Sequence, residues 1–224
     1  MIIKNKIPLI SRFKKFGGDF IPDIIEYLKE KIESDPFITI SLGCDSVQRH
    51  RKTLFAVTIM VYNTDVRHGA HVVFFRENQI KIRDNQDRLQ KEALIVHEIA
   101  EYLNEQLSKF YVRKDLKEIS RKQYKYHLQK CLGKFDYVNF NDEENVIKNM
   151  TLTQGEKDVI FNLIDLHLDF NPNEGKIDDR GYSINKSNKA YKSYVPWLRS
   201  LGYRVWVKPM SFASSSAADL LLKN

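Results

Sequence analysis

The sequence predicts an α/β domain built on a mixed five-stranded sheet with helices on both faces. Three β-rich segments, at residues 37–44, 53–62 and 70–76, follow one another with short links, and such links join antiparallel neighbours into a meander. Two further strands are expected at residues 163–170 and 203–207, and a helical pattern follows each of them. Strands that alternate with helices extend a sheet in parallel, so the whole pattern indicates one mixed sheet.

The helices beside this sheet are predicted from apolar residues at helical spacing. Residues 19–34 form the first helix, and the Asp-Pro pair that follows ends it. Residues 86–109 form the longest helix. Its expected buried stripe consists of Leu89, Val96, Ile99, Leu103 and Leu107. A third helix is expected at residues 187–201, where Pro196 would kink it or mark its start. Residues 211–224 close the chain as a short helix.

Length and composition are those of one domain that carries an insertion. Hydrophobic residues make up 42% of the 224, which is enough for one sizeable core, so a single domain is expected over residues 1–224. Residues 109–158 predict a basic helical insertion, since residues 109–134 contain nine Lys or Arg against two acids. Four basic residues near one helical face form either a strip that tracks phosphates or an ordinary solvated face: Lys114, Lys117, Arg121 and Lys125.

Composition also indicates the compartment and the kind of partner. No apolar run approaches the ~18 residues of a membrane span, and residues 1–16 lack the pattern of a secretion signal. Cys44 and Cys131 have no zinc spacing, so a reducing cytoplasm is expected, either bacterial or that of a phage host. The formal charge of +7 and a pI near 9.2 favour a polyanionic partner, although a lysine-rich surface alone would give the same balance.

Four acidic residues stand where the local pattern favours an apolar or small residue. A carboxylate in such a place costs roughly several kcal/mol unless it is paired or binds a metal. Glu92 falls on the buried stripe of the long helix, and Asp169 lies on the polar face of the fourth strand, nearest its end. Asp45 follows the first strand at the rim of the sheet, beside Gly43, whose small size would leave room for a ligand. Asp219 lies in the apolar final helix.

Each of these acids also has an ordinary structural explanation. Asp45 and Asp169 could be turn residues, Glu92 could reach solvent or pair with a lysine, and Asp219 could suit the positive end of its helix. Together, however, they form an all-oxygen set. Hard oxygen ligands select Mg²⁺ or Mn²⁺, and two such ions about 4 Å apart can activate a water and stabilise the leaving oxygen of a phosphodiester.

The order of elements and four short motifs resemble the ribonuclease-H-like superfamily and, more narrowly, its YkuK-type family from bacteria and phages. The motifs lie at residues 43–46, 88–92, 167–173 and 202–219, and the last is the most specific. The resemblance covers roughly residues 19–108 and 160–224.

This resemblance implies a nuclease-like site at the four acids. Asp45 would bridge two ions, Glu92 and Asp169 would each hold one, and Asp219 would complete the second site. All four would therefore act both as metal ligands and as catalytic residues for Mg²⁺ or Mn²⁺.

Other side chains near these acids are candidates for contacts with nucleic acid. We expect such contacts from Ser46, Lys208 and Ser215, in addition to the basic strip. The serines at residues 214–216 have a second explanation, because they could cap the final helix, and capping is the favoured interpretation.

Three ring-bearing residues are expected to have structural roles. His167 shares a strand face with Asp169 and could support it, but a histidine on the strand surface is the favoured interpretation. Trp197 and Trp206 are expected in the core rather than as platforms on which bases stack.

The leading functional hypothesis is a metal-dependent nuclease that hydrolyses phosphodiester bonds in DNA, RNA or a hybrid. The first alternative is a catalytically inactive ribonuclease-H-like protein that binds nucleic acid. The second is an assembly or structural protein of a phage, with the insertion as a docking surface for another protein or a second copy.

Overall fold

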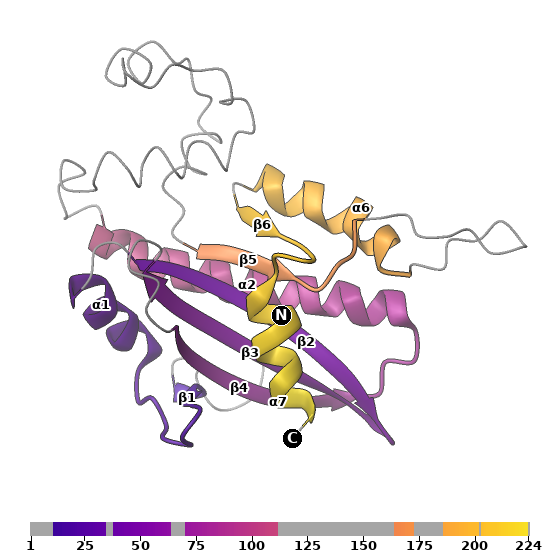
Figure 1. The fold of residues 1–224 in the computed structure, drawn as a ribbon, viewed down its shortest axis with the longest axis horizontal. Coiled ribbons are helices and arrows are strands. Elements are labelled where there is room, and N and C mark those ends of the chain that lie inside the picture. The colour runs from indigo at the N-terminus through magenta and orange to yellow at the C-terminus, as the bar shows by residue number, and fades with distance from the viewer. Residues whose placement is uncertain are drawn as a thin grey trace, which may run out of the picture.

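The structure is a computed structural model in which a six-stranded mixed sheet forms the centre (Figure 1). It describes residues 11–34, 38–63, 70–111, 164–172, 186–201 and 203–223. The strands are β1 (Lys14–Lys15), β2 (Ile38–Arg49), β3 (Lys52–Asn63), β4 (His71–Ile80), β5 (Ile164–Leu168) and β6 (Arg204–Trp206). Their order across the sheet is β1-β4-β3-β2-β5-β6.

This topology confirms the predicted fold class and corrects the number of strands. Strands β2, β3 and β4 form the antiparallel meander, and β5 and β6 extend it in parallel on the other side of β2. The additional strand is β1, which pairs with the edge of β4. A strand made of two lysines carries no alternating apolar pattern, so β1 could not be predicted from side-chain periodicity.

The meander strands are longer than predicted, and this changes the position of Asp45. β2 continues past the apolar run, with Asp45 opposite Ala56 and Arg49 opposite Lys52. The prediction that Asp45 ends a strand is therefore wrong, because pairing with β3 carries the backbone onward through polar residues. The loop of the β2–β3 hairpin consists only of His50 and Arg51, and His50 has a φ of 42°.

Among the described residues, four α-helices and one π-helical segment accompany the sheet. They are α1 (Ile24–Ser34), α2 (Asn85–Tyr111), α6 (Lys186–Ser200), the π-helical η3 (Ala213–Ala218) and α7 (Asp219–Lys223). α1 begins later than predicted because Asp23 caps it, its Oδ1 accepting from the amide of Ile25 at 2.7 Å. Asp84 caps α2 in the same way through the amide of Gln86 at 2.6 Å. Pro196 lies inside α6.

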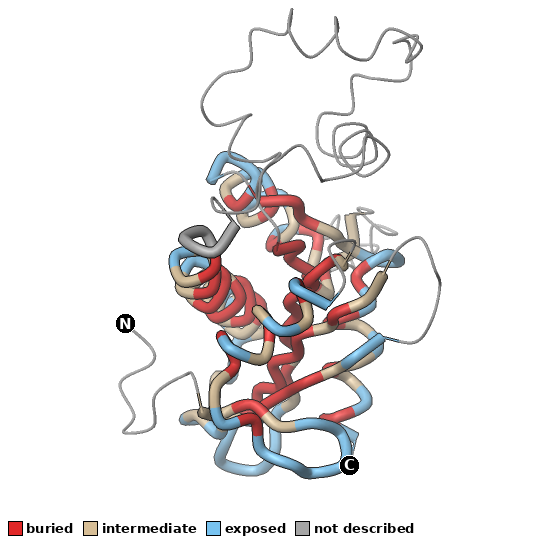
Figure 2. Tube along the Cα trace, turned by 90° about the vertical axis from the view of Figure 1, so that its left-hand side faces the viewer, coloured by how far each residue is buried: buried red, intermediate tan, exposed pale blue. Residues whose placement is uncertain are grey.

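The helices lie on both faces of the sheet, as predicted. α2 packs on one face of β2 and also contacts α1 and α6, whereas η3 and α7 pack on the opposite face of β2 and β3. α7 crosses in front of the strands in Figure 1, and α2 runs behind them. All five residues of the predicted stripe on α2 are buried. Figure 2 shows the buried residues gathered in the interior, with exposed residues on the outer surfaces.

Part of the predicted insertion lies outside the described residues. α2 extends to Tyr111, and residues 112–163, with the proposed basic strip of Lys114, Lys117, Arg121 and Lys125, are not described. Among the described helices, none is both long and apolar enough to cross a membrane.

Candidate active site

Asp45 and Asp169 lie side by side because their strands are parallel neighbours. In the pairing of β2 with β5, Cys44 lies opposite Leu168. Asp45 and Asp169 are the next residues on these two segments, so they occupy matching positions just where β5 ends and β2 continues toward Arg49.

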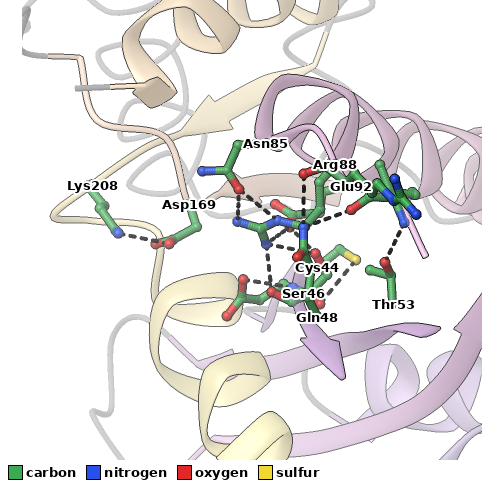
Figure 3. Close-up of polar contacts among 12 residues, drawn as sticks. Cys44, Ser46, Gln48, Thr53, Asn85, Arg88, Glu92, Asp169 and Lys208 are labelled. Atoms are coloured by element: carbon green, nitrogen blue, oxygen red, sulfur yellow. Dashed lines mark hydrogen bonds and ion pairs between the residues drawn. The ribbon is translucent and has the colours of Figure 1, made fainter. Parts of the chain in front are cut away.

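Glu92 approaches the same end of the sheet from α2. Its side chain is 1% exposed, and its Oε1 accepts from Ser46 Oγ at 2.6 Å and from Arg88 Nη1 at 3.0 Å (Figure 3). The other oxygen, Oε2, is buried and has no hydrogen-bond partner among the described residues. The alternative that Glu92 reaches solvent is thus wrong, and its ion-pair partner is an arginine rather than a lysine.

The surroundings of Glu92 favour its protonated form. Burial is the largest cause, and with the negative charge of Asp45 it raises the pKa of Glu92 to about 8. Arg88 and the Ser46 hydroxyl favour the ionised form but do not outweigh burial.

Asp45 connects the four acids electrostatically. Its carboxylate is half-buried, and Oδ1 accepts from the amide of Ser46 at 2.7 Å. Burial is the main reason that the pKa of Asp45 is raised to about 6, and the charges of Asp169 and Asp219 add to the shift. Each of the other three acids therefore lies within electrostatic reach of Asp45, as the effect of Asp45 on Glu92 also shows.

Two lysines pair with the remaining acids. Lys208 Nζ lies 2.8 Å from Asp169 Oδ2 (Figure 3), while Asp169 Oδ1 is buried without a hydrogen-bond partner among the described residues. Lys223 Nζ lies 2.5 Å from Asp219 Oδ2. Asp219 is the first residue of α7, but η3 runs into α7 without a break and the Asp219 amide is bonded to the Ser214 and Ser216 carbonyls, so Asp219 does not lie at a free helix N-terminus.

Three contacts from the sheet hold η3, the segment that leads to Asp219. Thr58 Oγ1 donates to the Ala213 carbonyl at 2.6 Å, and the Ala213 amide donates to His167 Nδ1 at 3.2 Å. A Cβ added at Gly43 would lie 2.5 Å from the Ala213 carbonyl carbon. The space beside Gly43 is therefore filled by η3, and the prediction that it leaves room for a ligand is wrong.

His167 is buried, which corrects the prediction of a histidine on the strand surface. It is 3% exposed, because η3 covers its face of β5. Burial, together with the charge of Arg204, lowers the pKa of His167 to about 4, so the ring is neutral near pH 7. The neutral ring that accepts at Nδ1 carries its proton on Nε2.

The serines of η3 do not act as helix caps. Ser214 Oγ and Ser215 Oγ both donate back to the Ser211 carbonyl, at 3.0 and 2.9 Å, and the first turn has no side-chain cap. The capping prediction is wrong because hydroxyls inside a helix bond to carbonyls three or four residues earlier. A π-helical turn at this place is itself typical of functional sites.

The residues proposed to contact nucleic acid differ in how far they are exposed. Lys208 is 45% exposed and Ser215 is half-buried. Ser46 is 7% exposed, and its hydroxyl is directed to Glu92 rather than to the surface. Trp197 and Trp206 are half-buried, and Trp197 packs against the main core.

Two polar groups near the acids were not predicted from the sequence. Arg88 bonds to Glu92, and its spacing of four residues on a helix was an available signal. Asp165 forms a buried ion pair with Arg204 and accepts from Trp206 Nε1 at 2.9 Å. These contacts of Asp165 join β5 to β6, which are parallel neighbours far apart in sequence, so no local pattern predicts them.

The donor chemistry of the four acids fits a hard divalent cation, although the side chains are not gathered around one point. Within the described ranges, no group of three or more His, Cys, Asp or Glu side chains is placed to hold a metal ion. Two of the acids nevertheless have a buried oxygen without a partner, Glu92 Oε2 and Asp169 Oδ1. Such oxygens are costly unless a proton or a cation satisfies them.

Comparison with known proteins gives one match. The family model described as Ribonuclease H-like matches residues 19–129, just under half of the chain. No curated protein and no solved structure matches. The narrower YkuK-type resemblance stays a prediction.

The matched segment begins before α1 and includes the whole meander and α2. It therefore contains Asp45 and Glu92, whereas Asp169 and Asp219 lie beyond it. The match suggests a nuclease-like role on nucleic acid. Over this segment the chain is similar to the ribonuclease H-like family, and the mixed sheet of the structure agrees with that similarity.

Proposed function

We propose that this protein hydrolyses phosphodiester bonds in nucleic acid with Mg²⁺ or Mn²⁺ held by Asp45, Glu92, Asp169 and Asp219. The proposal is supported by the electrostatic coupling of Asp45 to three acids from distant parts of the chain, Glu92, Asp169 and Asp219. The charges of Asp169 and Asp219 raise the pKa of Asp45, and the charges of Asp45 and Asp169 raise the pKa of Glu92.

The four acids would divide the ligand positions as the resemblance implies. Asp45 would bridge two ions, Glu92 and Asp169 would each bind one, and Asp219 would complete the second site. When bound, the ions would activate a water and stabilise the leaving oxygen. The positive charge of the ions would also offset the burial and the carboxylate repulsion that raise the pKa values of Asp45 and Glu92.

The lysines at the site have a role in this proposal. Lys208 and Lys223 neutralise Asp169 and Asp219 in the structure. Both lysine side chains are exposed, at 45% and 68%, so each can leave its acid at little energetic cost. Once released, Lys208 would lie beside the acids and contact a substrate phosphate. The net charge of +7 supports attraction of a nucleic acid.

A second candidate function is binding of nucleic acid without catalysis. It is favoured by the ion pairs, since Arg88, Lys208 and Lys223 already neutralise three of the acids. In this alternative the acids and their cationic partners are structural. Binding would then be tight and sensitive to salt, with no metal-dependent turnover.

The deciding experiment is a cleavage screen with Mn²⁺ over duplex, hybrid and branched substrates. Asp45→Asn keeps the size of the side chain and removes its charge, so it should abolish cleavage. Asp19→Asn is the matched control, because Asp19 is exposed. Cleavage that survives Asp45→Asn would overturn the assignment, and salt-sensitive binding without cleavage would establish the second candidate.

A further inference from the structure

We infer that Ser46, Arg88 and Asn85 form a clamp that leaves Glu92 Oε2 as the one oxygen of that carboxylate available to a metal ion. The inference rests on the proposed function, because it assigns these three residues to the positioning of a proposed ligand. It is carried by the hydrogen bonds around Glu92 (Figure 3).

The first part of the clamp fixes Glu92 Oε1. Ser46 Oγ donates to it at 2.6 Å, and Arg88 Nη1 lies 3.0 Å from it. A carboxylate oxygen that accepts a hydroxyl and a guanidinium proton is held by charge-assisted bonds, which are stronger than neutral ones. The carboxylate plane is thereby set, and Oε2 must point away from both donors.

The second part of the clamp fixes Arg88 itself. Its Nη1 also donates to the Ser46 carbonyl at 2.6 Å and lies 2.8 Å from Ser46 Oγ. Its Nε and Nη2 both donate to Asn85 Oδ1, at 3.2 and 3.1 Å. Asn85 begins α2, so the guanidinium is held between the first turn of the helix and strand β2.

The remaining oxygen is the argument for a ligand. Glu92 is 1% exposed, and Oε2 is buried with no partner in the part of the chain that the structure describes. A proton on Oε2 would itself need an acceptor, and none lies within hydrogen-bond reach among the described residues, so a ligand would satisfy this oxygen better than a proton. Cys44, Asp45 and Ser46 are consecutive on β2, and Cys44 lies opposite Leu168 of β5. The clamp residue Ser46 is therefore adjacent to the proposed ligand Asp45.

Lysine cannot replace Arg88 in this arrangement. The clamp uses three nitrogens of one planar group to reach Asn85, Ser46 and Glu92 together, and an ammonium offers a single nitrogen. Removal of a group that orients a metal ligand typically costs about 10- to 100-fold in metal affinity. Ser46→Ala removes one hydroxyl and should weaken binding by a similar factor.

The test is a titration of the metal-free protein with Mn²⁺. Binding is measured by calorimetry and by the loss of the electron paramagnetic resonance signal of free Mn²⁺. The variants are Arg88→Lys and Ser46→Ala, with Arg83→Lys as the matched control at an exposed arginine. We expect a loss of about 10- to 100-fold in affinity for both variants and none for the control. Circular dichroism checks the fold, and Ser46→Ala carries the test if Arg88→Lys does not fold.

Each outcome bears on the inference. If the wild-type protein binds Mn²⁺ and Glu92→Gln abolishes that binding, the proposed function stands. If Arg88→Lys and Ser46→Ala then fold and bind Mn²⁺ with unchanged affinity, the clamp is overturned. No Mn²⁺ binding by the wild-type protein overturns both. Selective loss in Arg88→Lys and Ser46→Ala supports the clamp even where no nucleic-acid substrate has been found.

Discussion

Glu92→Gln should make the metal-free protein less sensitive to rising pH. Burial is the main reason that the pKa of Glu92 is raised from its ordinary value of 4.5 to about 8 in the folded protein. Between these values the folded protein keeps a proton that the unfolded chain releases. The free energy of unfolding of the wild-type protein therefore falls as the pH rises through this window. Glutamine does not titrate, so the variant lacks this contribution.

The size of the effect follows from the shift in pKa. Each pH unit within the window changes the relative stability by 1.36 kcal/mol at most, so two units, from pH 5.5 to pH 7.5, give about 3 kcal/mol. Glu92 is 1% exposed, so solvent does not screen this contribution appreciably. The amide oxygen of glutamine can still accept from Ser46 and Arg88, which keeps the local structure.

The assay is urea unfolding at pH 5.5, 6.5 and 7.5 in the presence of a chelator. The difference in unfolding free energy between the variant and the wild-type protein should increase with pH in favour of the variant. Glu101→Gln, at an exposed position of the same helix, should track the wild-type protein at every pH. Parallel pH profiles for wild type and Glu92→Gln would refute the reasoning about burial.

Three further perturbations test how the sheet holds the site. Gly43→Ala should destabilise the protein by about 1–3 kcal/mol in chemical unfolding, because the new Cβ would overlap the Ala213 backbone; an unchanged midpoint would contradict the close approach. Thr58→Val should cost about 1–3 kcal/mol, since it leaves the buried Ala213 carbonyl without its donor; thermal melts of near-equal midpoint would count against that bond. Arg204→Met should cost about 3–5 kcal/mol by leaving Asp165 buried without its ion-pair partner, and the double variant with Asp165→Asn should recover part of the loss.

The fold could be predicted from the sequence because its main signals are local. The meander segments and the stripe on α2 follow from apolar periodicity, and the structure confirms them. The ends of the strands could not be predicted in this way. β2 runs on past Asp45 because β3 pairs with it, and backbone pairing leaves no trace in side-chain pattern.

The candidate site could be predicted in its residues but not in its contacts. Glu92 was recognisable as a charge on an apolar stripe, and the structure buries it as that position requires. Burial of His167 could not be foreseen, because η3, which covers it, comes 46 residues later in the chain. The role of Gly43 depends on the same segment. The sequence therefore predicted that Gly43 leaves room for a ligand, whereas the space beside it is filled by η3.

The most direct test of the central claim is the anomalous scattering of crystals soaked in Mn²⁺. We expect a peak bounded by Asp45, Asp169 and Glu92, with Lys208 turned away from the Asp169 carboxylate and Glu92 Oε2 facing the ion. Crystals at millimolar Mn²⁺ that show no peak at these acids, with the pairs Lys208–Asp169 and Lys223–Asp219 intact, would contradict it.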